Sequence, residues 1–155
     1  MILEGPFRYR LEYRDRCLQS VKDEQGSDTK FAPPMTKVGF KLYIVCRLGM
    51  VLYVGVTNRP IRDRLRFGEN PNGASGYHGY KWMDQPGPYD LFIWKVQGDS
   101  ENPRMEIETL EAEIVYAVRA KTGQWPSGQT EIHFHESSNE DRKLSEGILA
   151  TVYYC

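Results

Sequence analysis

Two runs of strand-forming residues, separated by only three residues, constrain the fold more than any other feature of this chain. Residues 39–46 and 50–56 are rich in β-branched, aliphatic and aromatic side chains, and Gly49 lies in the short connection between them. Runs of this kind with so short a connection pair as an antiparallel hairpin. Tyr43 and Tyr53 would then lie on adjacent strands.

The flanking segments predict further strands and helices. Residues 7–14 alternate apolar and charged side chains at the period of a half-exposed strand, and residues 89–96 predict a buried strand. Gly123 is a suitable stop for a helix that ends just before it. Apolar residues at helical spacing predict three helices, over residues 61–67, 104–121 and 139–154.

Length and composition limit the class of protein. A chain of 155 residues suits one compact domain, and 40% hydrophobic residues can form a core without disulfides or zinc. The three cysteines are far apart and show no metal-ligand spacing. No apolar run approaches the roughly 18 residues of a membrane helix, and no signal-like segment opens the chain. We therefore expect a cytoplasmic protein with no membrane partner.

Charge is balanced overall but unevenly distributed. The chain carries 20 Lys and Arg against 21 Asp and Glu, yet residues 37–66 are strongly basic and contain only one acid. The acids gather later, mainly in residues 106–113 and 136–146. Such a distribution permits binding of a polyanion on one side of a small domain. The candidate phosphate contacts in the basic segment are Lys41, Arg59, Arg62 and Arg66.

An ordered set of residues resembles the GIY-YIG nuclease superfamily. The set consists of Leu42-Tyr43-Ile44, the hairpin, Tyr53-Val54-Gly55, Arg64 on the next helix and Glu111 on a later one. The resemblance covers roughly residues 37–135, which leaves residues 1–36 as an N-terminal extension and residues 136–155 as a C-terminal helix packed on the same domain. It implies an α+β fold with a small three-stranded mixed sheet, an antiparallel first hairpin and flanking helices.

The resemblance also implies a divalent-metal-dependent endonuclease that hydrolyses DNA phosphodiester bonds. Tyr43 would orient or deprotonate the attacking water with help from Tyr53. Arg64 would stabilise charge on the phosphate, and Glu111 would bind Mg²⁺ or Mn²⁺, which suit oxygen ligands. Glu113 is the alternative carboxylate on the same helix. Gly55 would have a structural role, allowing close approach of the backbone beneath the site.

Two positions depart from the family pattern. Gly68 stands where many members carry a histidine, and His78 is the candidate substitute acid or base. An asparagine that usually follows a Pro-aromatic pair is absent, and Gln129 offers the same amide group.

These departures leave other functions open. One is a catalytically weak module that binds nucleic acid or a protein partner through its basic face. Another is an α+β protein whose likeness to the family is accidental. For a nuclease, the substrate would be DNA, including branched or single-stranded forms, with recognition supplied by the terminal segments or by a protein partner.

Overall fold

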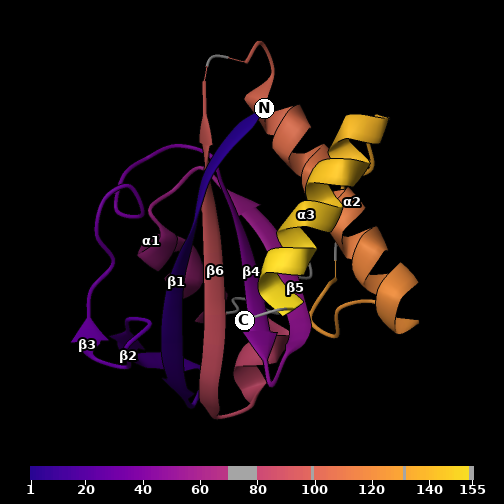
Figure 1. The fold of residues 1–155 in the computed structure, drawn as a ribbon. Helices are drawn as coiled ribbons and strands as arrows, with labels where there is room; N and C mark the ends of the chain where they lie inside the picture. The colour runs from indigo at the N-terminus through magenta and orange to yellow at the C-terminus, as the bar shows by residue number, and fades with distance from the viewer. Residues whose placement is uncertain (70–79, 99, 131, 154–155) are drawn as a thin grey trace.

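The computed structural model describes residues 1–69, 80–98, 100–130 and 132–153, and shows an antiparallel sheet with helices on both faces (Figure 1). The strands are β1 (Ile2–Arg14), β2 (Cys17–Lys22), β3 (Asp28–Thr29), β4 (Lys41–Arg47), β5 (Met50–Thr57) and β6 (Gly87–Gln97). The helices are α1 (Ile61–Glu69), the short 3₁₀ helix η2 (Lys81–Asp84), α2 (Pro103–Thr122) and α3 (Asn139–Tyr153).

The sheet is larger than the sequence suggested. Its strands follow the order β3-β2-β1-β6-β4-β5, and every pairing between the described strands is antiparallel. The expectation of a small three-stranded mixed sheet is therefore wrong. The reason is β1, which pairs with β6 from Ile2 opposite Gln97 to Tyr13 opposite Gly87. The N-terminal segment thus lies in the middle of the sheet.

The alternation in β1 explains why one of its faces is buried. Leu11 and Tyr13 lie in the core, and Phe7 and Tyr9 pack against it from the same side of the strand. A two-residue period determines which side chains face the core, but it does not determine which strand lies alongside. The partner of β1 is about 80 residues away in the chain, as the pairing of Arg10 with Asp90 shows.

The expected hairpin is formed by β4 and β5. Arg47 pairs with Met50, so that Leu48 and Gly49 make a two-residue turn. Both turn residues have positive φ angles, 50° and 74°, which is the conformation of a type I′ turn. The register set by the turn shifts by one residue between Val45 and Cys46, which places Tyr43 opposite Gly55 on the adjacent strand.

The helices divide between the two faces of the sheet. α2 and α3 pack on the face that carries Leu42, Ile44 and Trp94, whereas α1 and η2 pack on the other face (Figure 1). The side chain of Asn102 accepts a hydrogen bond from the first turn of α2, and Gly123 ends that helix in the left-handed conformation, as its position predicted.

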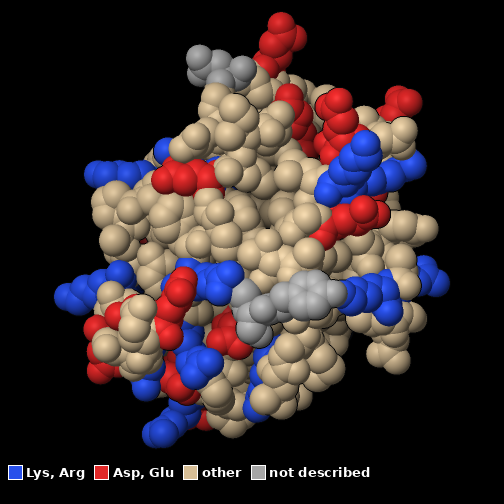
Figure 2. Space-filling model, in the orientation of Figure 1, with Lys and Arg blue, Asp and Glu red and all other residues tan. Residues whose placement is uncertain are grey.

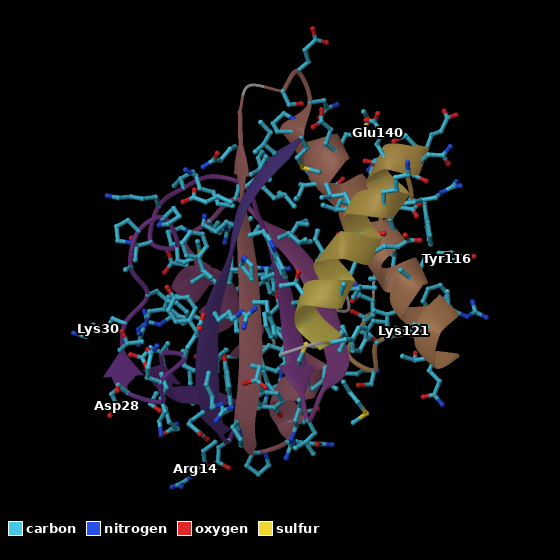
Figure 3. The ribbon with its side chains drawn as sticks, viewed as in Figure 1. Arg14, Asp28, Lys30, Tyr116, Lys121 and Glu140 are labelled. Atoms are coloured by element: carbon cyan, nitrogen blue, oxygen red, sulfur yellow. The ribbon has the colours of Figure 1, made fainter. Side chains whose placement is uncertain are left out.

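The outward surface of the helical layer is polar and mixed in charge. Tyr116 and Lys121 on α2 and Glu140 on α3 lie on the outside of the molecule (Figure 3). Figure 2 shows Lys and Arg interspersed with Asp and Glu over this side, so it does not present a basic face. The helices that the structure describes include none with the length and apolar character needed to cross a bilayer.

Candidate functional site

A pocket of about 360 Å³ lies at the β5 edge of the sheet. Tyr53 on β5, Arg64 on α1 and Glu111 on α2 all line it. These side chains come from elements on both faces of the sheet, and they can meet because β5 is the outermost strand. Three of the residues predicted to be catalytic are therefore brought together.

Tyr43 lies behind this pocket. Its side chain is fully buried, at 0% exposure, and it is not part of the pocket wall. Its hydroxyl accepts a hydrogen bond from Nε of Arg64 at 3.3 Å, and its ring centroid lies 5.9 Å from that of Tyr53. Tyr43 therefore contacts the pocket residues from within the core, whereas Tyr53 is the tyrosine on the wall.

Gly55 makes this tyrosine arrangement possible. A Cβ atom at this position would lie 2.5 Å from Cε1 of Tyr53 and 2.7 Å from the hydroxyl oxygen of Tyr43. Both distances are much shorter than a van der Waals contact, so any side chain would force the two rings to move. Because Gly55 has no side chain, it leaves room for the two tyrosine rings.

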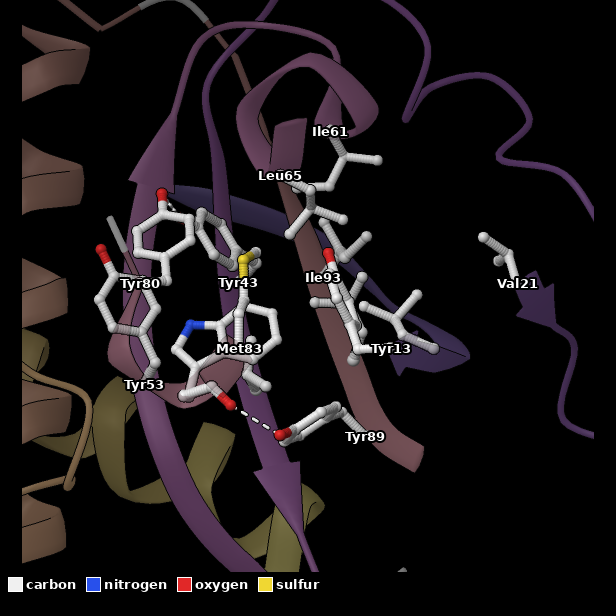
Figure 4. Close-up of a cluster of buried hydrophobic side chains, with 14 of the residues drawn as sticks. Tyr13, Val21, Tyr43, Tyr53, Ile61, Leu65, Tyr80, Met83, Tyr89 and Ile93 are labelled. Carbon is white, nitrogen blue, oxygen red and sulfur yellow. Dashed lines mark hydrogen bonds between the residues drawn. The ribbon is translucent and has the colours of Figure 1, made fainter. Parts of the chain in front are cut away.

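A third tyrosine completes the cluster. The hydroxyl of Tyr80 lies 2.9 Å from that of Tyr43, and its ring centroid lies 4.9 Å from that of Tyr53. Figure 4 shows the three rings beside β4 and β5. Sequence reasoning missed Tyr80, because it follows a Gly- and Asn-rich segment and precedes a short 3₁₀ helix that has no clear periodicity.

Burial determines the protonation states of Tyr53 and Tyr80. It raises the pKa of Tyr53 well above 10, with Tyr43 adding to the rise and Arg64 opposing it, and it also raises the pKa of Tyr80. Burial alone would lower the pKa of Arg64, but the hydroxyls around it, that of Tyr43 foremost, raise it. At neutral pH Tyr53 and Tyr80 are therefore neutral phenols beside the permanent cation of Arg64.

A second carboxylate lies on the pocket wall one turn before Glu111. Glu108 accepts hydrogen bonds from Nε of Arg104 at 2.8 Å and from Nε2 of His135 at 3.0 Å. Burial would raise the pKa of Glu108, but these partners lower it, so it stays ionised. His133 also lines the pocket. The spacing of Arg104, Glu108 and Glu111 on one helix face is the signal that could have revealed this group.

The side chains around the pocket suit a divalent cation that keeps several water ligands, rather than one that is coordinated by protein ligands alone. Within the described residues, no group of three or more His, Cys, Asp and Glu side chains is arranged to hold a metal. Mg²⁺ commonly keeps several waters and uses one or two carboxylates together with substrate phosphates. Glu111, buried at the wall, can provide such a carboxylate. Glu113 instead lines a groove between α2 and α3, 3.9 Å from Arg142.

The predicted phosphate contacts separate into different environments. Lys41 is 1% exposed, and its ammonium donates hydrogen bonds to the backbone carbonyls of residues 37, 39 and 59. Arg59 lines the pocket and lies over the ring of Phe67. Arg62 and Arg66 are exposed on α1 and are not part of the pocket wall.

Gln129, the candidate substitute for the missing asparagine, is not part of the pocket wall. Oε1 of Gln129 accepts a hydrogen bond from the backbone N–H of Val54 at 3.1 Å, and the N–H of Gly128 donates to the carbonyl of Leu52. This segment therefore covers the open edge of β5. His78 lies outside the described residues.

No family model, curated protein or solved structure matches this chain.

Proposed function

We propose that the chain is a divalent-metal-dependent endonuclease of the GIY-YIG type, and that the pocket at the β5 edge holds a DNA phosphodiester. The observation that carries this proposal is the presence of Tyr53, Arg64 and Glu111 around one pocket, with Tyr43 hydrogen-bonded to Arg64. Phosphodiester hydrolysis needs an oriented water, a cation for the charge on the phosphate and relief of charge on the leaving oxygen.

The burial of the two tyrosines assigns their roles. Tyr53 lies on the wall and, as a neutral phenol, would orient the attacking water by hydrogen bonding. Tyr43 has no exposed surface and would act through Arg64, by holding its Nε. This arrangement leaves the rest of the guanidinium fork to meet a phosphate oxygen.

Glu111 would hold Mg²⁺ or Mn²⁺ in the pocket, with the remaining ligands supplied by water and the phosphate. When bound, the cation would neutralise charge on the phosphate and on the leaving oxygen. Arg59 on the wall, and the exposed Arg62 and Arg66 on α1, would contact neighbouring phosphates of the DNA strand.

The test is cleavage of supercoiled plasmid and of single-stranded DNA with Mg²⁺, with Mn²⁺ and with chelator. Glu111→Gln should lower the cleavage rate by about 10²-fold or more, because it removes the negative charge that holds the cation. Glu106→Gln is the matched control, since Glu106 lies on the same helix, is not part of the pocket wall and bonds to Ser100. It should cut at the wild-type rate.

Cleavage by the wild type that survives in Glu111→Gln would contradict the assignment of the carboxylate. If the wild type cuts neither DNA with any metal but still retards DNA in a gel, the binding-module function replaces the nuclease proposal. In that case binding should weaken steeply with added salt, because phosphate contacts release counterions.

A further inference from the structure

Tyr80 occupies space that only a glycine at position 68 leaves open. A Cβ atom on Gly68 would lie 2.0 Å from Cδ2 of the Tyr80 ring and 2.4 Å from Cε2. Gly68 lies inside α1, where glycine is a poor helix former. The glycine therefore allows the ring of Tyr80 to pack directly against the backbone of α1.

From this position Tyr80 contacts the other members of the cluster. Its hydroxyl is hydrogen-bonded to Tyr43, and Cζ of Arg64 lies 5.3 Å above the centre of its ring. Tyr80 is itself buried and is not part of the pocket wall. The face of the Tyr80 ring contacts Arg64 directly. Tyr80 also contacts Arg64 indirectly, because its hydroxyl is hydrogen-bonded to the Tyr43 hydroxyl that accepts the hydrogen bond from Nε of Arg64.

We propose that Tyr80 is a positioning residue that directs Arg64 into the pocket. Arg64 can rotate about several bonds, and two fixed contacts, one on Nε and one on the guanidinium face, restrict it to one direction. Tyr80 supplies the second contact and immobilises the hydroxyl of Tyr43 that supplies the first. The contribution of Tyr80 to the cleavage rate rests on the proposed nuclease function, whereas its effect on the orientation of Arg64 does not.

The first test removes the hydroxyl and keeps the ring. In Tyr80→Phe, the rate constant for DNA cleavage should fall about tenfold while the Kd for DNA stays within about twofold, because one positioning hydrogen bond is lost. Tyr13→Phe is the control. Tyr13 belongs to the same buried hydrophobic core but not to the tyrosine cluster, and its buried hydroxyl has no hydrogen-bond partner among the described residues. Cleavage by Tyr13→Phe should match the wild type.

The second test does not depend on nuclease activity. The Nε–H group of Arg64 gives its own signal in ¹⁵N-resolved NMR spectra, and its exchange with water reports the bond to Tyr43. Exchange should be at least about fivefold faster in Tyr80→Phe than in the wild type or Tyr13→Phe. The reason is that loss of the neutral hydrogen bond between Tyr80 and Tyr43 weakens the neighbouring bond from Arg64 to Tyr43. Unchanged exchange would overturn the proposal, whatever the cleavage result.

The third test examines the contact with Gly68 by a double-mutant cycle. Gly68→Ala should lower the thermal midpoint of the wild type, because the new methyl group meets the Tyr80 ring. In Tyr80→Ala the ring is gone, so the same substitution should raise the midpoint through its better helix propensity. A fall of equal size in both backgrounds would mean that Tyr80 does not occupy this space.

The tests separate the two proposals. If Nε–H exchange of Arg64 is faster in Tyr80→Phe but the wild type cleaves no DNA, the positioning role of Tyr80 is retained and the nuclease function is refuted.

Discussion

Lys41→Met gives a sharp test of a residue whose charge suggested a surface role. The ammonium of Lys41 donates to the backbone carbonyls of residues 37 and 39 at 2.7 and 2.8 Å, and to that of residue 59 at 3.3 Å. These bonds join the segment before β4 to the segment after β5. Methionine has a similar length but cannot donate, so all three carbonyls would lose their partner.

The size of the effect follows from these bonds. A hydrogen bond from a charged donor contributes about 1.5–3 kcal/mol. Three such bonds are offset by the cost of burying the ammonium and by water that reaches carbonyls of exposed residues. We expect a net loss of about 2 kcal/mol in the free energy of unfolding, or about 4–8 °C in Tm for a chain of this size.

Burial, with a smaller contribution from Lys95, lowers the pKa of Lys41 below its usual 10.5. Between the lowered pKa and 10.5, the unfolded chain binds more protons than the folded chain, so the stability of the wild type should rise with pH through this window. In Lys41→Met this contribution to the rise should disappear.

Urea titration of the wild type, Lys41→Met and the control Lys95→Met measures the stability change, with Lys95 being the cross-strand neighbour of Lys41 on β6. The control should be nearly unchanged. DNA affinity as a function of salt provides the second measurement. A lost phosphate contact would reduce the salt slope by about one, whereas a lost internal contact leaves the slope unchanged. A reduced slope with unchanged stability would refute our reasoning about Lys41.

Two further changes test the geometry of the β4–β5 hairpin. Gly55→Ala should lower the free energy of unfolding by about 2 kcal/mol, because its methyl group meets two tyrosine rings, and an unchanged urea midpoint would contradict this packing. Leu48→Asn should raise it by about 0.5–1 kcal/mol, since Leu48 has a φ of 50° and is 88% exposed, and asparagine tolerates this conformation better. A lower midpoint for Leu48→Asn would count against the turn type.

The part of the fold that could be predicted is the part fixed by local pattern. The β4–β5 hairpin, α2 and the strand character of β1 follow from turn length and apolar periodicity over a few residues. The pairing of β1 with β6 depends instead on side chains that meet across most of the chain. Periodicity gives no information on such partners, and for this reason the predicted sheet had too few strands.

The candidate site divides in a similar way. Tyr53, Arg64 and Glu111 could be proposed because their order along the chain resembles a known arrangement. Tyr80 could not, because its contribution depends on a glycine in α1 that admits its ring. Lys41 illustrates the opposite error. The sequence does not distinguish a lysine that contacts DNA from one whose ammonium donates to three backbone carbonyls.

The position of β6 between β1 and β4 has a consequence for the order in which the chain folds. The β1–β2 and β4–β5 hairpins pair locally and can form as soon as their residues leave the ribosome. Among the strands that the structure describes, the two hairpins have no common partner until Gly87–Gln97 is synthesised, because β6 lies between them in the sheet. Non-local pairing of this kind slows folding. Glu111 follows β6 in the chain, so the pocket can be completed only after all the strands of the sheet have been synthesised.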